Sequence, residues 1–137
     1  MRVSAAASAF LALTSAQAQP RGSIEGFWRN PSGTAIIGIA SCGSSLCGKV
    51  AWASARGQRE AATSTKNVVG TTVLTELRAS GDHWSGSLFI PDDNIHVSAK
   101  LEVLGSRQLK LTGCGMLGLI CRSQLWTRTD GALPRQD

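Results

Sequence analysis

Four cysteines are the residues whose spacing in this sequence most directly implies chemistry. They fall into two local pairs, Cys42 with Cys47 and Cys114 with Cys121, and each pair flanks a short glycine-containing loop. A zinc site is one alternative, but no histidine lies near either pair. Redox-active pairs favour a C-x-x-C motif at a helix N-terminus, which neither pair has. We therefore expect two structural disulfides, each stabilising the fold by roughly 2 kcal/mol through closure of a short loop.

Histidines and paired carboxylates are the other side chains that could support catalysis or hold a metal ion. His83 sits beside a predicted turn, and His96 alternates onto the solvent face of a predicted strand. No Gly-x-Ser-x-Gly elbow or His-Glu-x-x-His motif accompanies them. Asp92 and Asp93 suggest a carboxylate pair or a calcium site, but in a Pro-Asp-Asp-Asn sequence they are typical of an Asx-turn. We expect no catalytic residue, no metal site and no cofactor.

Residues 1–18 have the features of a secretory signal peptide. Arg2 supplies the positive charge, residues 3–13 form a short apolar run, and Ala16-Gln17-Ala18 fits the cleavage pattern. The run is too short and too polar for a membrane-spanning helix, which needs about 20 apolar residues. We expect cleavage before Gln19, a periplasmic or secreted location and no transmembrane segment.

The charge of the chain is modestly basic and is spread along it. The formal net charge is +5, with no run of basic residues and no aromatic residues interleaved among them, so a nucleic-acid interface is not expected. The excess is suited to solubility or to weak attraction toward anionic envelope surfaces.

Alternation of apolar and polar residues is the main pattern of the remaining sequence. From Ile95 to Val103 every second residue is apolar and the residues between are polar, which is typical of a strand with one buried face. Turn signals such as Asn30-Pro31-Ser32-Gly33 separate such runs at near-regular intervals. The pattern predicts roughly eight strands, over residues 26–30, 34–42, 46–53, 69–79, 83–90, 95–104, 108–114 and 121–129.

These short connections predict antiparallel pairing within one all-β domain over residues 19–130. Eight such strands can close into an up-and-down barrel, and a two-sheet sandwich is the alternative. The segment 54–68 lacks the alternation and is either a short helix or a loop. Residues 131–137 are expected to form a polar tail.

A series of short motifs, spread over most of the sequence after residue 25, resembles the sequence of a known family. They are Gly26-Phe27-Trp28, Pro31-Ser32-Gly33-Thr34-Ala35-Ile36-Ile37, Cys42-Gly43-Ser44-Ser45-Leu46-Cys47-Gly48-Lys49-Val50, Trp84-Ser85-Gly86, Pro91-Asp92-Asp93, Ser98-Ala99-Lys100-Leu101, Gly113-Cys114 and Cys121-Arg122-Ser123-Gln124-Leu125-Trp126-Thr127-Arg128. In this order they resemble a bacterial family catalogued as domain of unknown function 2147, a set of exported proteins with a lipocalin-like (calycin) barrel. The resemblance implies a small-molecule cavity and specifies no ligand. Segment 54–70 departs from the family, in which an Asn-Pro-rich connection is usual.

Gly26-Phe27-Trp28 is also similar to the opening motif of lipocalins, in which an indole on the first strand stacks against a basic side chain from the last. Here Arg122 or Arg128 could supply the guanidinium, because a planar cation packs well on an aromatic face. We expect Trp28 to close the base of the barrel.

Two functional hypotheses follow. The first is a binding barrel for an apolar or amphipathic molecule, with a mainly aliphatic cavity, since the sequence contains no tyrosine and few phenylalanines. The expected lining residues are Ile37, Ile39, Trp52, Leu77, Leu88, Val97, Leu101 and Leu111. The second hypothesis is an envelope structural or interaction protein whose barrel is packed solid.

Overall fold

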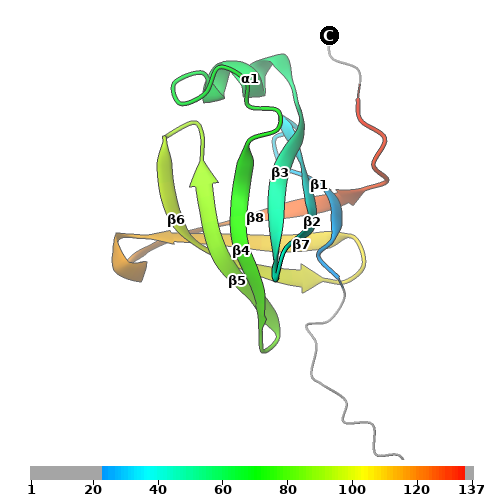
Figure 1. Cartoon of the computed structure of the whole chain (residues 1–137), viewed down its shortest axis with the longest axis vertical. Coiled ribbons are helices and arrows are strands. Elements are labelled where there is room, and N and C mark those ends of the chain that lie inside the picture. Colours follow the sequence, from blue (N-terminus) through cyan, green and yellow to red (C-terminus); the bar gives the residue numbers. More distant parts are fainter. Residues whose placement is uncertain (1–22, 135–137) are drawn as a thin grey trace, which may run out of the picture.

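Eight antiparallel strands close into a barrel in the computed structural model, which describes residues 23–134 (Figure 1). The expected signal peptide lies outside the described residues, as do the last three residues of the expected tail. Each strand pairs with its neighbours in the chain, and the last pairs with the first. The strands are β1 Gly26–Arg29, β2 Ala35–Cys42, β3 Ser45–Ala53, β4 Thr72–Ser80, β5 His83–Ile90, β6 Ile95–Leu104, β7 Gln108–Gly115 and β8 Ile120–Thr129.

The barrel closes through the short strand β1, which uses both of its edges. Trp28 lies opposite Ile37 of β2 on one side and opposite Arg128 of β8 on the other. Closure leaves no sheet edge free to pair with another chain. The predicted all-β up-and-down barrel is thereby confirmed, and the sandwich alternative is excluded. The predicted and observed strand bounds differ most at β4, whose predicted start is residue 69 and whose observed start is Thr72. The reason is a tight turn over Val68–Thr71, in which Gly70 has a φ of 91°.

The two ends of the barrel are built differently. One end carries the chain entering β1 and the β2–β3, β4–β5 and β6–β7 turns, and we call it the closed end. The other carries the β1–β2 turn, the β3–β4 connection, the β5–β6 turn and the β7–β8 connection, and we call it the open end. Short turns suffice at the closed end, whereas the β3–β4 connection at the open end is long enough to contain a helix.

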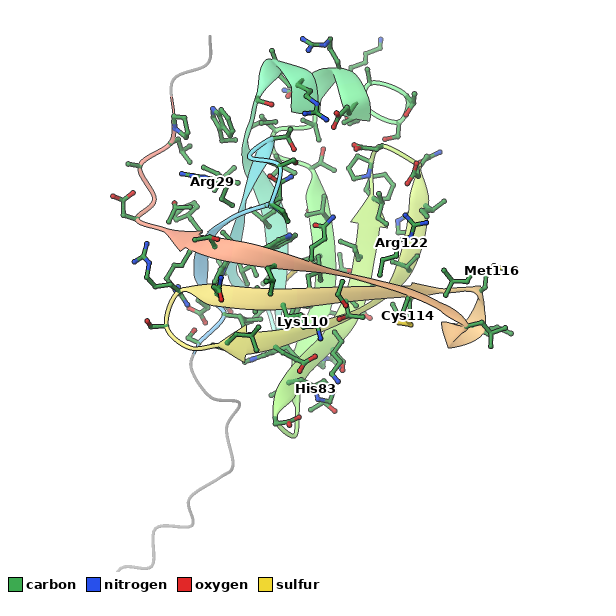
Figure 2. The ribbon with its side chains drawn as sticks, turned by 180° about the vertical axis from the view of Figure 1, so that it is seen from behind. Arg29, His83, Lys110, Cys114, Met116 and Arg122 are labelled. Atoms are coloured by element: carbon green, nitrogen blue, oxygen red, sulfur yellow. A yellow bond between two sulfur atoms is a disulfide. The ribbon has the colours of Figure 1, made fainter. Side chains whose placement is uncertain are left out.

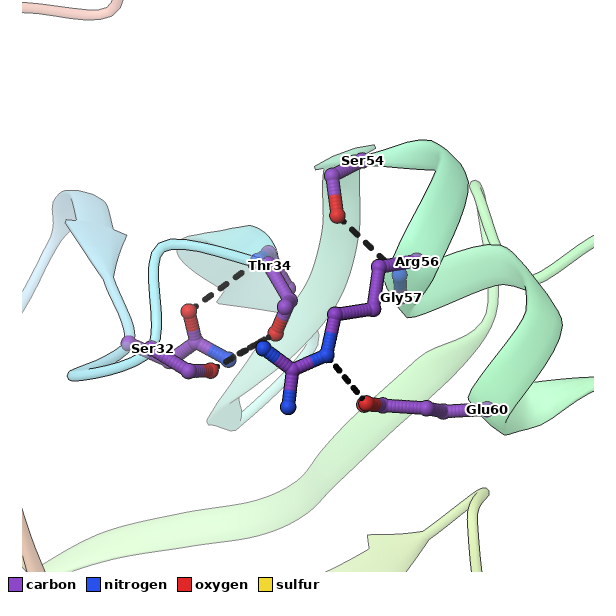
Figure 3. Close-up of polar contacts among 8 residues, drawn as sticks. Ser32, Thr34, Ser54, Arg56, Gly57 and Glu60 are labelled. Carbon is purple, nitrogen blue, oxygen red and sulfur yellow. Dashed lines mark hydrogen bonds and ion pairs between the residues drawn. The ribbon is translucent and has the colours of Figure 1, made fainter.

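Helix α1, Ala55–Ala61, lies across the open end (Figure 1) and resolves the segment that the sequence left open. Ser54 caps the helix by accepting a hydrogen bond from the Gly57 N–H at 3.0 Å (Figure 3). The Ser54 N–H donates in turn to the Thr34 carbonyl of the β1–β2 turn at 2.8 Å. A Cβ on residue 57 would lie 2.6 Å from that carbonyl oxygen, so a glycine is needed for the helix to approach this closely.

Trp28 fills the closed end. Its side chain is fully buried, and its indole N–H donates to the Ile24 carbonyl at 2.8 Å. Arg128 lies over the ring, with its guanidinium carbon 4.2 Å from the ring centroid. The same guanidinium donates to the carbonyls of Ser23 and Glu25 at 2.8 Å and of Ser106 at 3.1 Å. One arginine therefore joins the N-terminal segment, the β6–β7 turn and the last strand.

The cysteines form the two local disulfides predicted, Cys42–Cys47 and Cys114–Cys121. The first closes the β2–β3 turn at the closed end. The second joins β7 to β8 at the open end, where Cys114 and Cys121 are cross-strand partners. Both therefore fix hairpin connections and not the barrel wall.

Replacement of Trp28 by alanine should lower the free energy of unfolding by about 3–5 kcal/mol, because a fully buried indole leaves a large cavity. Urea denaturation of parent and variant measures the difference. Phe27→Ala is the matched control. Phe27 precedes Trp28 in the sequence, but its ring lies on the outer face and is 37% exposed, so this substitution should lower the free energy of unfolding by less than half as much. A loss below about 1 kcal/mol for Trp28→Ala would show that the indole does not plug the barrel.

Candidate functional site

A cavity of about 820 Å³ occupies the open half of the barrel and communicates with solvent beside α1. Its walls come from strands on every side of the barrel, and α1 and the β5–β6 turn form part of its rim. Most of its wall is aliphatic: Ile37, Val50, Val68, Val73, Leu88, Val97 and Leu111. This volume lies within the roughly 300–1,000 Å³ that is usual for small-molecule sites.

Half of the residues expected to line the cavity do so. Ile37 and Leu111 are nearly buried in its wall, and Leu88 and Val97 are partly accessible within it. Leu88 and Val97 are cross-strand partners on β5 and β6, so their side chains lie together on the inner face.

Ile39, Leu77 and Leu101 do not line the cavity, which corrects the sequence-based prediction. All three point inward as expected, but they are at most 2% exposed and lie toward the closed end, in the solid core. Alternation along a strand indicates which face a side chain occupies. It carries no information about depth along the barrel axis, and depth decides whether an inward side chain packs or borders the void.

Trp52 is also misplaced by the prediction, for a different reason. A β-bulge between Ile36 and Ile37 puts one extra residue into β3, so that Trp52 lies opposite Ile36 while Val50 lies opposite Ile37. Val50 faces the cavity, and Trp52 therefore shares the outer face with Ile36. Strict alternation assigns positions 50 and 52 to one face, and the bulge reverses that for the tryptophan.

The two candidate arginines take different positions. Arg128 stacks on Trp28 at the closed end, whereas Arg122 lies six residues away on β8 and borders the cavity at the open end. The cross-strand partner of Arg122 is Gly113 on β7, and Figure 2 shows Arg122 on the side of the barrel that carries Met116. Of the two arginines that the sequence left open for the Trp28 contact, Arg128 makes it. Within residues 23–134 the Arg122 guanidinium makes no ion pair and no side-chain hydrogen bond.

Another part of the rim is acidic. Glu60 of α1 and Asp92 and Asp93 of the β5–β6 turn all border the cavity. The Glu60 carboxylate accepts a hydrogen bond from Arg56 at 2.8 Å (Figure 3). Partial burial, then the negative charges of Glu60 and Asp93, raise the pKa of Asp92 above its ordinary range.

Hydrogen bonds tie the segment after α1 to the β5–β6 turn. The Thr63 hydroxyl donates to the Asp92 carbonyl at 3.2 Å, and the Ser64 hydroxyl donates to the Pro91 carbonyl. These contacts bring together residues nearly 30 positions apart in the chain. They hold the acidic rim as one unit over one side of the opening.

Sequence reasoning missed Gly113 as a cavity residue. It lies on β7 between Ala99 and Arg122, and a Cβ there would be 3.2 Å from Val97 Cγ2 and 3.4 Å from Leu88 Cδ2. A larger side chain would occupy space that belongs to the cavity. The signal was a glycine within a strand pattern, which often marks a close approach to a ligand or to a neighbouring chain.

Neither histidine borders the cavity. His83 Nδ1 lies 3.0 Å from an Asp82 carboxylate oxygen at the end of the barrel away from α1 (Figure 2), and His96 stacks on Phe89 with ring centroids 4.7 Å apart. No group of three histidine, cysteine or acidic side chains in the described part of the chain could hold a metal ion. Across residues 23–134, no helix has both the length and the apolar character to cross a membrane.

The raised pKa of Asp92 predicts a pH-dependent stability. The folded state holds this proton more tightly than the unfolded state, so its contribution is complete below pH 3.8 and is lost as the pH rises through the folded-state pKa. Asp92→Asn should therefore be more stable than the parent at pH 7, by less than about 1 kcal/mol because solvent screens an exposed carboxylate.

Denaturation midpoints measured between pH 3 and pH 7 test this prediction, with Asp130→Asn as a control on an exposed carboxylate of the C-terminal segment. The gain from Asp92→Asn should shrink toward pH 3, where the aspartic acid is neutral in both states. A variant less stable than the parent at pH 7, or a gain that does not change with pH, would contradict the assignment.

Comparison with known proteins gives a family and no function. No curated protein matches the chain, and no solved structure matches it. Residues 26–128, which run from β1 to β8, match a family described as uncharacterized protein conserved in bacteria (DUF2147). The match covers most of the chain, and its limits are those of the barrel itself. The chain therefore belongs to the DUF2147 family of bacterial proteins.

Proposed function

We propose that the barrel binds a small apolar or amphipathic molecule in the open-end cavity and carries out no chemistry on it. The single observation that carries the proposal is an aliphatic cavity of about 820 Å³ that opens to solvent at one end. The rival hypothesis of an interaction protein requires a barrel filled with side chains. Only the closed half is filled in that way, with Ile39, Leu77 and Leu101 in its core.

The cavity wall determines the class of ligand. Its aliphatic side chains provide area for burial and few directional groups, so affinity would come mainly from apolar surface removed from water. Charged and polar groups also border the cavity: Arg122 and Gln124 on β8, Glu60 on α1, and Asp92 and Asp93 in the β5–β6 turn. A molecule with an apolar body and a polar end fits this division.

Arg122 is the group best placed to meet an anionic end. Among the described residues it makes no ion pair, whereas Glu60, which also borders the cavity, pairs with Arg56. A carboxylate or phosphate at this position would gain a charge-assisted hydrogen bond. We therefore propose amphipathic anions, such as medium-chain fatty acids, as the preferred class.

The proposal includes an extracytoplasmic location. Disulfides persist in oxidising compartments and are rare in the cytosol. The two disulfides of this bacterial chain therefore support a periplasmic or secreted protein.

Displacement of an environment-sensitive fluorescent probe by fatty acids tests the binding proposal, with affinities of roughly micromolar expected. Val97→Trp, which places a large ring in the cavity wall, should weaken binding about tenfold or more. Lys100→Trp adds the same ring to the exposed outer face of β6 and should leave binding unchanged. Equal affinities for parent and Val97→Trp would place the probe elsewhere, and turnover abolished by His83→Ala or His96→Ala would indicate an enzyme.

Arg122→Gln tests how much the charged end of the ligand contributes to affinity, apart from its apolar body. The substitution should weaken binding of a fatty acid about tenfold, the effect of losing one charge-assisted hydrogen bond, and should leave the alcohol of equal chain length unaffected. Parallel displacement titrations with the acid and the alcohol provide the measurement. Arg107→Gln, at the closed end, is the matched control. An equal loss of affinity for the acid and the alcohol would show that Arg122 does not bind the charged headgroup.

A further inference from the structure

The β7–β8 connection carries a concentration of exposed apolar side chains. We call residues 116–120 the apolar tip; Met116 is 70% exposed, Leu117 104%, Leu119 83% and Ile120 52%. Single exposed apolar residues are common on proteins, but contiguous ones mark an interaction site. Figure 1 shows β7 and β8 running out beyond the neighbouring strands to this turn, and Figure 2 shows Met116 at its outer limit.

The backbone holds the apolar tip away from the barrel. The Cys114–Cys121 disulfide closes its base, where the two cysteines are cross-strand partners. Met116 and Leu117 adopt φ angles of 50° and 59°, in the left-handed region that residues with a Cβ adopt at an energetic cost. The tip is thus a fixed projection, and its leucines do not fold back to cover the open end.

The size of the apolar tip argues for a lipid partner and against a protein partner. A stable protein interface involves roughly 20–30 residues a side, and the tip has five. Directly behind it the outer wall is polar, since the exposed Thr112 and Ser123 hydroxyls hydrogen-bond to each other at 2.9 Å. The apolar surface therefore ends at the base of the projection. A bilayer needs no complementary groove and accepts a small apolar projection.

The charge around the apolar tip matches an anionic lipid surface. No charged residue occurs between Lys110 and Arg122. Arg122 stands two residues from the tip, whereas Lys110 lies further along β7, opposite Glu102 of β6. The whole chain has a formal net charge of +5. Apolar insertion beside a basic residue, here Arg122, together with a basic net charge is a usual basis of peripheral binding to anionic membranes.

The apolar tip is continuous with the cavity. Met116 and Ile120 border the open-end cavity, as does Arg122 two residues further on, whereas Leu117 and Leu119 do not border it. We propose that the tip inserts shallowly into an anionic bilayer and brings the cavity mouth to the lipid surface, where an amphipathic ligand can enter or leave. The docking is shallow because loop backbone groups lack partners in hydrocarbon. The role in ligand transfer rests on the proposed binding function; the docking does not.

Flotation with vesicles tests the docking. The full-length mature protein is mixed with phosphatidylcholine vesicles that do or do not contain phosphatidylglycerol. The parent should float with the anionic vesicles, and the double variant Leu117→Ser/Leu119→Ser should partition about tenfold less. Leu104→Ser removes a 42%-exposed leucine from the last position of β6, at the closed end, and should partition as the parent does. Unchanged thermal melts would show that each variant is folded.

Three outcomes would overturn the docking proposal: a parent that floats with neither vesicle, a double variant that floats as the parent does, or an equal loss for Leu104→Ser. Dimers in sedimentation velocity that disappear in the double variant would also overturn it, in favour of a second copy of this chain. Probe displacement in vesicle-free buffer separates the two proposals, because Leu117 and Leu119 lie outside the cavity. The double variant should bind the probe as the parent does. If the parent floats with anionic vesicles but binds no probe, the docking proposal stands and the binding proposal, with the role in ligand transfer, fails.

Discussion

The contact between Trp28 and Arg128 is the interaction on which the rest of this barrel depends. β1 is only four residues long, so few hydrogen bonds join it to β8, and the stacked guanidinium reinforces that seam from the inside. The same guanidinium donates to the carbonyls of Ser23, Glu25 and Ser106, and so joins three segments at one point. The closed end is thereby sealed without a covering helix. A sealed end is a precondition for a cavity that opens in one direction only.

A barrel of eight strands has an interior that large side chains can just fill, and here the filling changes along the axis. Near the closed end Leu77, Leu101 and Trp28 leave no space. Toward the open end Val97 and Gly113, on the adjacent strands β6 and β7, carry little side-chain volume into the barrel, and α1 covers only part of the opening. Gly57 sets how closely that helix can approach the β1–β2 turn. The size of the cavity is therefore decided by a few small residues in the wall and by the glycine of α1 that approaches the β1–β2 turn.

The open end combines features from distant parts of the sequence. The acidic rim lies near the middle of the chain, whereas Arg122 and the apolar tip lie near its C-terminus. The Cys114–Cys121 disulfide fixes the geometry at that point, because it anchors the base of the tip and stands next to Arg122. An apolar projection, a cation and an aliphatic cavity are the parts required to take an amphipathic anion from a lipid surface. Their meeting at one end of the barrel links the two proposals made above.

Several features of this protein were determined by the sequence alone, because they depend on local patterns. Alternation and turn residues predicted the strands and their antiparallel order, and local cysteine spacing predicted both disulfides. Tertiary structure decided what depends on position along the barrel axis: Ile39 packs while Ile37 borders the cavity, although both face inward. It also decided that the bulge in β3 turns Trp52 outward and that Arg128, not Arg122, meets Trp28. Strand periodicity has two states, inside and outside, and depth along a closed barrel is set only when distant strands come into register.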